Sequence, residues 1–125
     1  MNGRPSIPPG ITAELLLDVF DLPISFHRCL VPITGGVTAA LMLSQAIWTS
    51  EALDPEVGGW FCRSQEEWTE ETGLSRWEQE TARRALRSGG FLEERRAGVP
   101  AKLWFRVRPE AVGRALQAHA NPVRR

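Results

Sequence analysis

The chain has 125 residues, a length that fits one domain with a core large enough to need neither disulfides nor a metal ion. Its apolar content of 42% and charged content of 24% are ordinary for a soluble globular protein. The formal net charge is zero, which taken alone argues against a protein that binds nucleic acid.

The charges are unevenly distributed along the chain. Residues 1–80 contain four Arg and twelve Asp or Glu, which gives −8, whereas residues 81–125 contain eleven Arg or Lys and three Glu, which gives +8. Such an asymmetry indicates a surface that binds a polyanion. The alternative is that the two parts pack together and their charges mix.

The first third of the chain predicts an arm, a helix and a strand. Residues 1–11 are rich in Pro and Gly and are expected to form a flexible N-terminal arm. A helix is predicted to begin at Thr12 and to end before Pro23. The β-branched and aromatic residues of 24–33 predict a short strand, which Pro32 confines to a sheet edge.

A long apolar helix is predicted next. Thr34-Gly35-Gly36 forms a turn that has neither the spacing nor the Lys of a phosphate-binding loop. Residues 37–53 are apolar nearly all round, a pattern typical of a central, buried helix. A loop over 54–59 and a short strand over 60–63 follow.

Two helix starts eleven residues apart predict a helix-turn-helix. Ser64 to Glu67 and Ser75 to Glu78 each have the pattern of a capping box, in which Ser and Glu satisfy free amides at a helix start. The first helix ends at Thr72-Gly73, so the turn is tight. The second extends to about Ser88, where Gly89-Gly90 ends it.

The rest of the chain predicts a hairpin and a last helix. Strands at 91–95 and 103–108 flank a tip, and a helix is expected over 109–118. Residues 119–125 are expected to form a flexible tail. Because no change in composition divides the chain, we predict a single domain over residues 12–118, with the helix-turn-helix at about 64–88 and the hairpin at about 91–108.

The residues that carry catalytic or metal chemistry are sparse. The two histidines, His27 and His119, are far apart, and Cys29 and Cys62 lack metal-ligand spacing. We therefore expect no enzyme, no cofactor and no bound metal. A pocket that joined His27, Cys29 and Cys62 would revive the enzyme interpretation. The chain has no export pattern at its start and no apolar segment long enough to span a bilayer, so we expect a cytoplasmic protein.

The second helix of the pair has one face suited to a polyanion. Ala82, Ala85 and Leu86 fall on the side predicted to pack inward. The opposite side, with Trp77 at its edge, collects charged residues: Arg76, Glu80, Arg83, Arg84 and Arg87. Arg side chains can contact phosphates or guanine in the major groove. The alternative is a solvated charged face.

The hairpin adds a second group of cations. Arg95, Arg96 and Lys102 flank its tip, while Arg106 and Arg108 alternate with apolar residues on the return strand. A basic hairpin after a basic helix is placed to hold the DNA backbone beside the groove that the helix enters. The alternative is an ordinary hairpin whose arginines pair with the acidic first part of the chain.

Residues 72–107 resemble the winged helix-turn-helix domain of phage and plasmid replication proteins of the replisome-organiser type, and related small phage DNA-binding proteins. The resemblance covers about residues 25–108 and is carried by Thr72 to Ser75, Gln79 to Arg83, Leu86, Gly90 to Leu92 and Gly98 to Lys102, after the upstream apolar helix. It implies a recognition helix at 75–88, a wing at 95–102 and a role in replication or transcription.

We thus predict a mainly α protein with a small antiparallel β-sheet that binds double-stranded DNA, as a homodimer by analogy. Six residues of the second helix are predicted to face the major groove: Arg76, Gln79, Glu80, Arg83, Arg84 and Arg87. Three hairpin residues are predicted to reach phosphates or the minor groove: Arg95, Arg96 and Lys102.

The alternative is a protein-interaction module on the same fold, in which the acidic first part or Trp77 docks a replication or transcription partner. One contiguous basic face would favour DNA, and interleaved charges would favour a protein partner.

Overall fold

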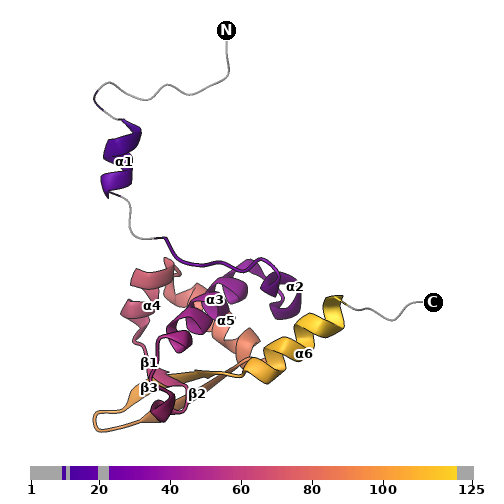
Figure 1. Cartoon of the computed structure of the whole chain (residues 1–125). Helices are drawn as coiled ribbons and strands as arrows, with labels where there is room; N and C mark the ends of the chain where they lie inside the picture. Colours follow the sequence, from indigo (N-terminus) through magenta and orange to yellow (C-terminus); the bar gives the residue numbers. More distant parts are fainter. Residues whose placement is uncertain (1–9, 11, 20–22, 121–125) are drawn as a thin grey trace, which may run out of the picture.

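A computed structural model of the chain describes residues 10, 12–19 and 23–120 (Figure 1). The expected arm lies outside the described residues apart from Gly10, as does the expected tail from residue 121 onward. The described elements are, in chain order, α1 (Ala13–Val19), α2 (Leu30–Thr34), α3 (Val37–Glu51), the 3-10 helix η1 (Pro55–Val57), β1 (Trp60–Cys62), α4 (Gln65–Thr72), α5 (Arg76–Ser88), β2 (Leu92–Ala97), β3 (Lys102–Val107) and α6 (Pro109–Ala120).

The three strands form one antiparallel sheet in the order β1-β3-β2. Phe61 pairs with Phe105, and Leu92 pairs with Val107. Because side chains alternate between the two faces of a strand, these apolar residues share the face that packs against the helices. The opposite face carries Trp60 and Trp104.

The core lies between this inner sheet face and helices α3, α4 and α5. The rings of Trp68 and Phe105 meet edge to face with centroids 5.3 Å apart, and Phe61 stacks on Phe105 at 5.9 Å. Along α3, Met42 and Leu43 are fully buried, which confirms the predicted central helix. Leu86 of α5 is also fully buried, so α5 is anchored on the core through one side.

The predicted strand over residues 24–33 is wrong, because residues 30–34 form the short helix α2. The amides of Leu30 and Val31 donate to the carbonyls three residues earlier, and Gly35 ends the helix in the left-handed region with φ 91°. Pro32 is tolerated because the first amides of a helix have no acceptor within it. The β-branched composition was therefore misleading here.

The order helix, strand, two helices and a two-stranded hairpin, from α3 to β3, is that of a winged helix-turn-helix domain. The predicted fold class, mainly α with a small antiparallel sheet, is confirmed. Figure 1 shows α1 apart from the other helices and α6 beyond the end of the sheet. Helix α6 includes His119 and Ala120, which were expected in the tail.

Candidate nucleic-acid interface

Two capping boxes set the start of α4 and α5. The amide of Glu67 donates to Ser64 Oγ at 3.1 Å, and the Ser64 amide donates to Glu67 Oε1 at 2.8 Å. Ser75 and Glu78 repeat the arrangement, with distances of 3.2 and 2.9 Å. Gly73 ends α4 in the left-handed region with φ 76°, which suits a residue without a Cβ. The predicted helix-turn-helix is confirmed in detail.

The prediction that Gln79 faces the major groove is wrong, because Gln79 is only 2% exposed. Its Nε2 donates to the carbonyls of Gln65 and Leu74 at 3.1 and 3.0 Å and to Thr69 Oγ1 at 2.9 Å. These acceptors lie at the start of α4, on α4 and in the turn. Gln79 therefore joins the two helices and is not available to a base.

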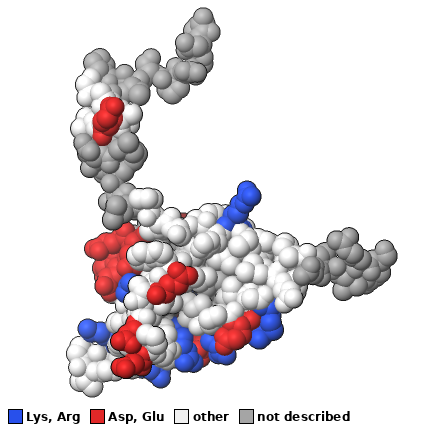
Figure 2. Space-filling model, viewed as in Figure 1, with Lys and Arg blue, Asp and Glu red and all other residues white. Residues whose placement is uncertain are grey.

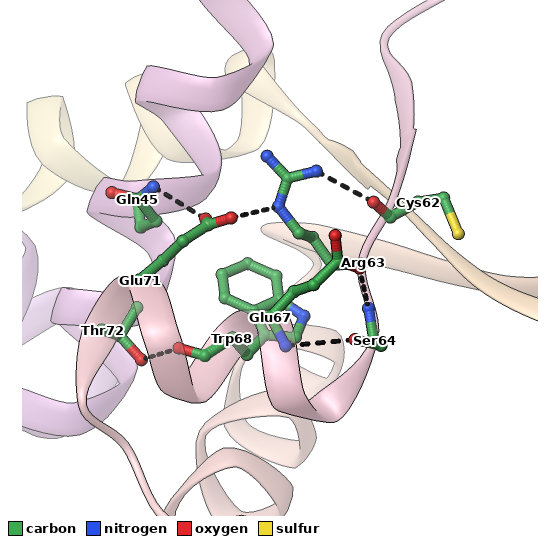
Figure 3. A network of polar contacts seen from close by, with 8 residues as sticks. All are labelled: Gln45, Cys62, Arg63, Ser64, Glu67, Trp68, Glu71 and Thr72. Carbon is green, nitrogen blue, oxygen red and sulfur yellow. Dashed lines mark hydrogen bonds and ion pairs between the residues drawn. The ribbon is translucent and has the colours of Figure 1, made fainter.

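A second polar network holds α4 against α3 and β1 (Figure 3). Arg63 Nε lies 2.7 Å from Glu71 Oε2, and Gln45 Nε2 of α3 donates to Glu71 Oε1 at 2.9 Å. Arg63 also donates to the carbonyl of Cys62 at the end of β1. Because all these side chains are at least partly buried, this network fixes the orientation of the helix-turn-helix on the domain.

Two of the predicted DNA contacts on α5, Arg83 and Arg87, are bound to the wing strand. Glu94 of β2, whose side chain is 7% exposed, accepts from Arg83 and Arg87 through its two oxygens, each at 2.5 Å. The Arg83 guanidinium also lies 5.9 Å from the ring centroid of Phe105. These two arginines therefore connect α5 to the sheet as well as presenting charge at the surface.

The remaining predicted contacts of α5 are exposed. Arg76 pairs weakly with Glu80 at 3.4 Å, and both side chains are largely open to solvent. Arg84 is exposed and has no carboxylate within ion-pair distance in the described part of the chain. Trp77, which the sequence placed at the edge of this face, is 71% exposed.

The two neighbouring arginines of the wing, Arg95 and Arg96, lie on opposite faces of the sheet. Arg95 pairs with Trp104, and its guanidinium lies 4.4 Å from the Trp60 ring centroid on the outer face. Arg96 pairs with Leu103 and shares the face that looks toward the helices. The two arginines were predicted to contact DNA together, but only Arg96 lies on the side of the sheet that faces α5.

A groove of about 460 Å³ separates the wing from the helix-turn-helix. Its cations are Arg63, Arg76, Arg83, Arg96 and Lys102, and its carboxylates are Glu67 and Glu80. The hydrogen bond from the Ser64 amide, together with the charges of Arg63 and Lys102, holds the pKa of Glu67 below its usual value. Arg63 lines this groove but was not predicted from the sequence, because its position depends on how β1 packs beside α4.

The outer face of the sheet is a mixture of both charges. Glu93 accepts from Arg106 at 2.7 Å and lies 3.5 Å from Arg108, and the Arg106 contact lowers the pKa of Glu93. Figure 2 shows Lys and Arg interleaved with Asp and Glu along the lower edge of the domain, and an acidic cluster beside α4. The charges on this face are therefore interleaved and do not form one contiguous basic patch.

The ion pairs among the described residues do not join the acidic and basic parts of the chain. Arg63–Glu71 and Arg76–Glu80 lie within residues 1–80, and the pairs of Glu93 and Glu94 lie within residues 81–125. The alternative in which hairpin arginines pair with the acidic first part is therefore wrong for this part of the structure. Arg84, Arg96 and Lys102 keep positive charge without a carboxylate partner among the described residues.

Possible metal ligands do not gather in one place within the described part of the chain. Within residues 10, 12–19 and 23–120, no three His, Cys, Asp or Glu side chains are grouped so as to hold a metal ion. Cys62 lines the groove beside the wing, but neither His27 nor Cys29 does. None of the described helices is long and apolar enough to cross a membrane.

Comparisons with known proteins identify no family for this chain. No family model matches the sequence, and no curated protein matches it. A solved structure titled "N-Terminal domain of DNA binding protein" is similar to this chain, with 16% identity and a TM-score of 0.45. The match covers 92% of this chain and 97% of the other.

Proposed function

We propose that this protein binds double-stranded DNA, with α5 in the major groove and the wing on the backbone. The observation that supports this most is the charge left on these two elements. Arg84 on α5 and Arg96 and Lys102 on the wing have no carboxylate partner among the described residues, and Arg96 and Lys102 line the groove beside α5. Arg76, Glu80 and Arg83 line the same groove, and Arg87 follows on the same side of α5, where it contacts Glu94.

The wing cations are suited to phosphate and the helix to bases. Lys and Arg at a groove edge bind phosphates without regard to sequence, and each contact makes binding more sensitive to salt. Arg84 projects from α5 and can form two hydrogen bonds to guanine. Arg95, stacked on Trp60, would reach only a phosphate that passes the outer face of the sheet.

The biological role we propose is that of a cytoplasmic regulator of replication or transcription, of the phage or plasmid type. The resemblance of residues 72–107 supports it. A helix of 13 residues contacts few base pairs, so a homodimer on a two-fold site would supply the missing specificity.

The test is fluorescence anisotropy with a labelled random-sequence duplex, from low to near-physiological salt. Arg96→Ala/Lys102→Ala should weaken binding to all sequences and reduce the slope of log K against log salt by about two. The control is Arg28→Ala/Arg114→Ala, which removes the same charge from exposed positions on the side of α2 and α6. Absence of binding at low salt by folded wild-type protein would overturn the proposal.

A second function is supported by the interleaved charges of the outer sheet face. There the protein would dock a replication or transcription partner through side chains such as Arg106 and Glu93. If the duplex experiment fails, capture of partners by wild type but not by Glu93→Lys/Arg106→Glu would support this function.

A further inference from the structure

Helix α5 has two adjacent stripes of outward-facing residues. Within each stripe, successive residues are four, three and four positions apart. Arg76, Glu80, Arg83 and Arg87 form the stripe nearer the wing, and its three arginines form ion pairs with Glu80 or Glu94. The second stripe consists of Trp77, Thr81, Arg84 and Ser88, which are all exposed.

The second stripe lies opposite the core. The buried residues of α5 are Gln79, Ala82 and Leu86, and at about 100° per residue their centre is directly opposite Trp77 and Arg84. The first stripe lies about a quarter turn to one side. The residues that would enter a major groove deepest are therefore those of the second stripe, of which only Arg84 is among the contacts predicted from the sequence.

The chemistry of this stripe differs from that of a purely basic face. Trp77 offers an exposed indole in the first turn, and Thr81 adds a methyl group one turn later. Arg76 precedes Trp77 in the chain and pairs with Glu80, and Arg84 lies on the same stripe two turns further along the helix. A helix face that carries both an exposed indole and arginines is suited to a polyanion that carries apolar groups.

The 5-methyl group of thymine is the apolar group that base pairs display in the major groove. We propose that Trp77 and Thr81 select thymine through this methyl group, and that Arg84 contacts guanine. Trp77 and Arg84 are seven residues apart, or about 10 Å along the helix. This corresponds to about three base pairs of B-DNA. The inference rests on the proposed function, since it names the sequences that the same surface prefers.

The experiment begins with selection of bound duplexes from a random library by the wild-type protein. The expected site contains thymine about three base pairs from guanine. Replacing that thymine with deoxyuridine removes only the methyl group, and wild-type affinity should fall about three- to tenfold at that position. Trp77→Ala should lose most of the preference for thymine over uracil, because only the smaller methyl group of Thr81 remains. The control is Trp48→Ala, which removes an exposed Trp from α3 and should keep the preference.

The outcomes separate this inference from the proposed function. Wild-type protein that binds duplexes but ignores the thymine-to-uracil change overturns the methyl contact and leaves DNA binding intact. A Trp77→Ala variant that keeps the thymine preference also overturns it. If wild-type protein binds no duplex at low salt, both proposals fail. Circular dichroism confirms that each variant is folded, which the exposure of Trp77 leads us to expect.

Discussion

Replacement of Gln79 by Ala tests whether this residue holds the helix-turn-helix together or contacts DNA. The side-chain amide has two hydrogens, which it shares among three acceptors at 2.9 to 3.1 Å. Two buried hydrogen bonds contribute about 2 kcal/mol net. Loss of four heavy atoms from a site that is 2% exposed adds about 1 kcal/mol for the cavity. We therefore expect Gln79→Ala to lower the free energy of unfolding by about 2–3 kcal/mol.

Urea denaturation, followed by the fluorescence of the five tryptophans, of which Trp68 is buried, measures this change as a shift of the unfolding midpoint. At about 1–3 kcal/mol per molar urea, the expected shift is about 1 M or more. Gln117→Ala, at an exposed position of α6, is the matched control and should change stability by less than about 0.5 kcal/mol. A Gln79→Ala variant of unchanged stability that prefers different bases would refute the structural role and restore the contact predicted from the sequence.

Three further predictions concern the wing and the end of α5. Glu94→Gln removes the carboxylate that two arginines of α5 contact. The domain should therefore be less stable to urea, and its affinity for DNA, measured by anisotropy at low salt, should increase several-fold. The contact with Arg106 lowers the pKa of Glu93 in the folded protein below its usual value. The stability that Glu93 contributes is therefore complete at neutral pH and is lost as pH falls from about 4.5 through the folded pKa. In Glu93→Gln the melting temperature should fall less steeply with acid than in the wild type. Gly89→Ala should cost about 1–3 kcal/mol, because an added Cβ would lie 2.5 Å from Phe91 Cε2.

Each of these predictions has a control in the same chain. Glu51→Gln, at an exposed helix end, should leave the acid dependence of melting unchanged. Gly113→Ala meets no atom within 4 Å in α6 and should stabilise the helix, in contrast to Gly89→Ala. Equal effects of the two glycine substitutions would contradict the packing argument, and a Glu94→Gln variant with weaker DNA binding would contradict the release of positive charge.

The parts of the fold that depend on neighbouring residues were predictable from the sequence. Both capping boxes require residues only three positions apart, and α4 and α5 begin where the Ser and Glu pattern placed them. The segment 24–33 could not be assigned in the same way. Its conformation depends on long-range anchoring, in which the amide of His27 donates to Ser44 Oγ of α3 at 3.0 Å. Composition alone does not contain that contact.

The candidate site was harder to predict because one buried polar residue changes the inferred rotation of a helix. With Ala82, Ala85 and Leu86 as the inward side, the outward face of α5 centres near Glu80 and favours the arginines beside the wing. With buried Gln79 in place of half-buried Ala85 in the inward set, that centre turns by about 40° toward Trp77 and Arg84. Gln79 was predicted to face the groove because its side chain is polar, and polar side chains are usually exposed. Identifying such a residue requires knowing that the turn between α4 and α5 leaves carbonyls that need a donor, which only the assembled pair of helices reveals.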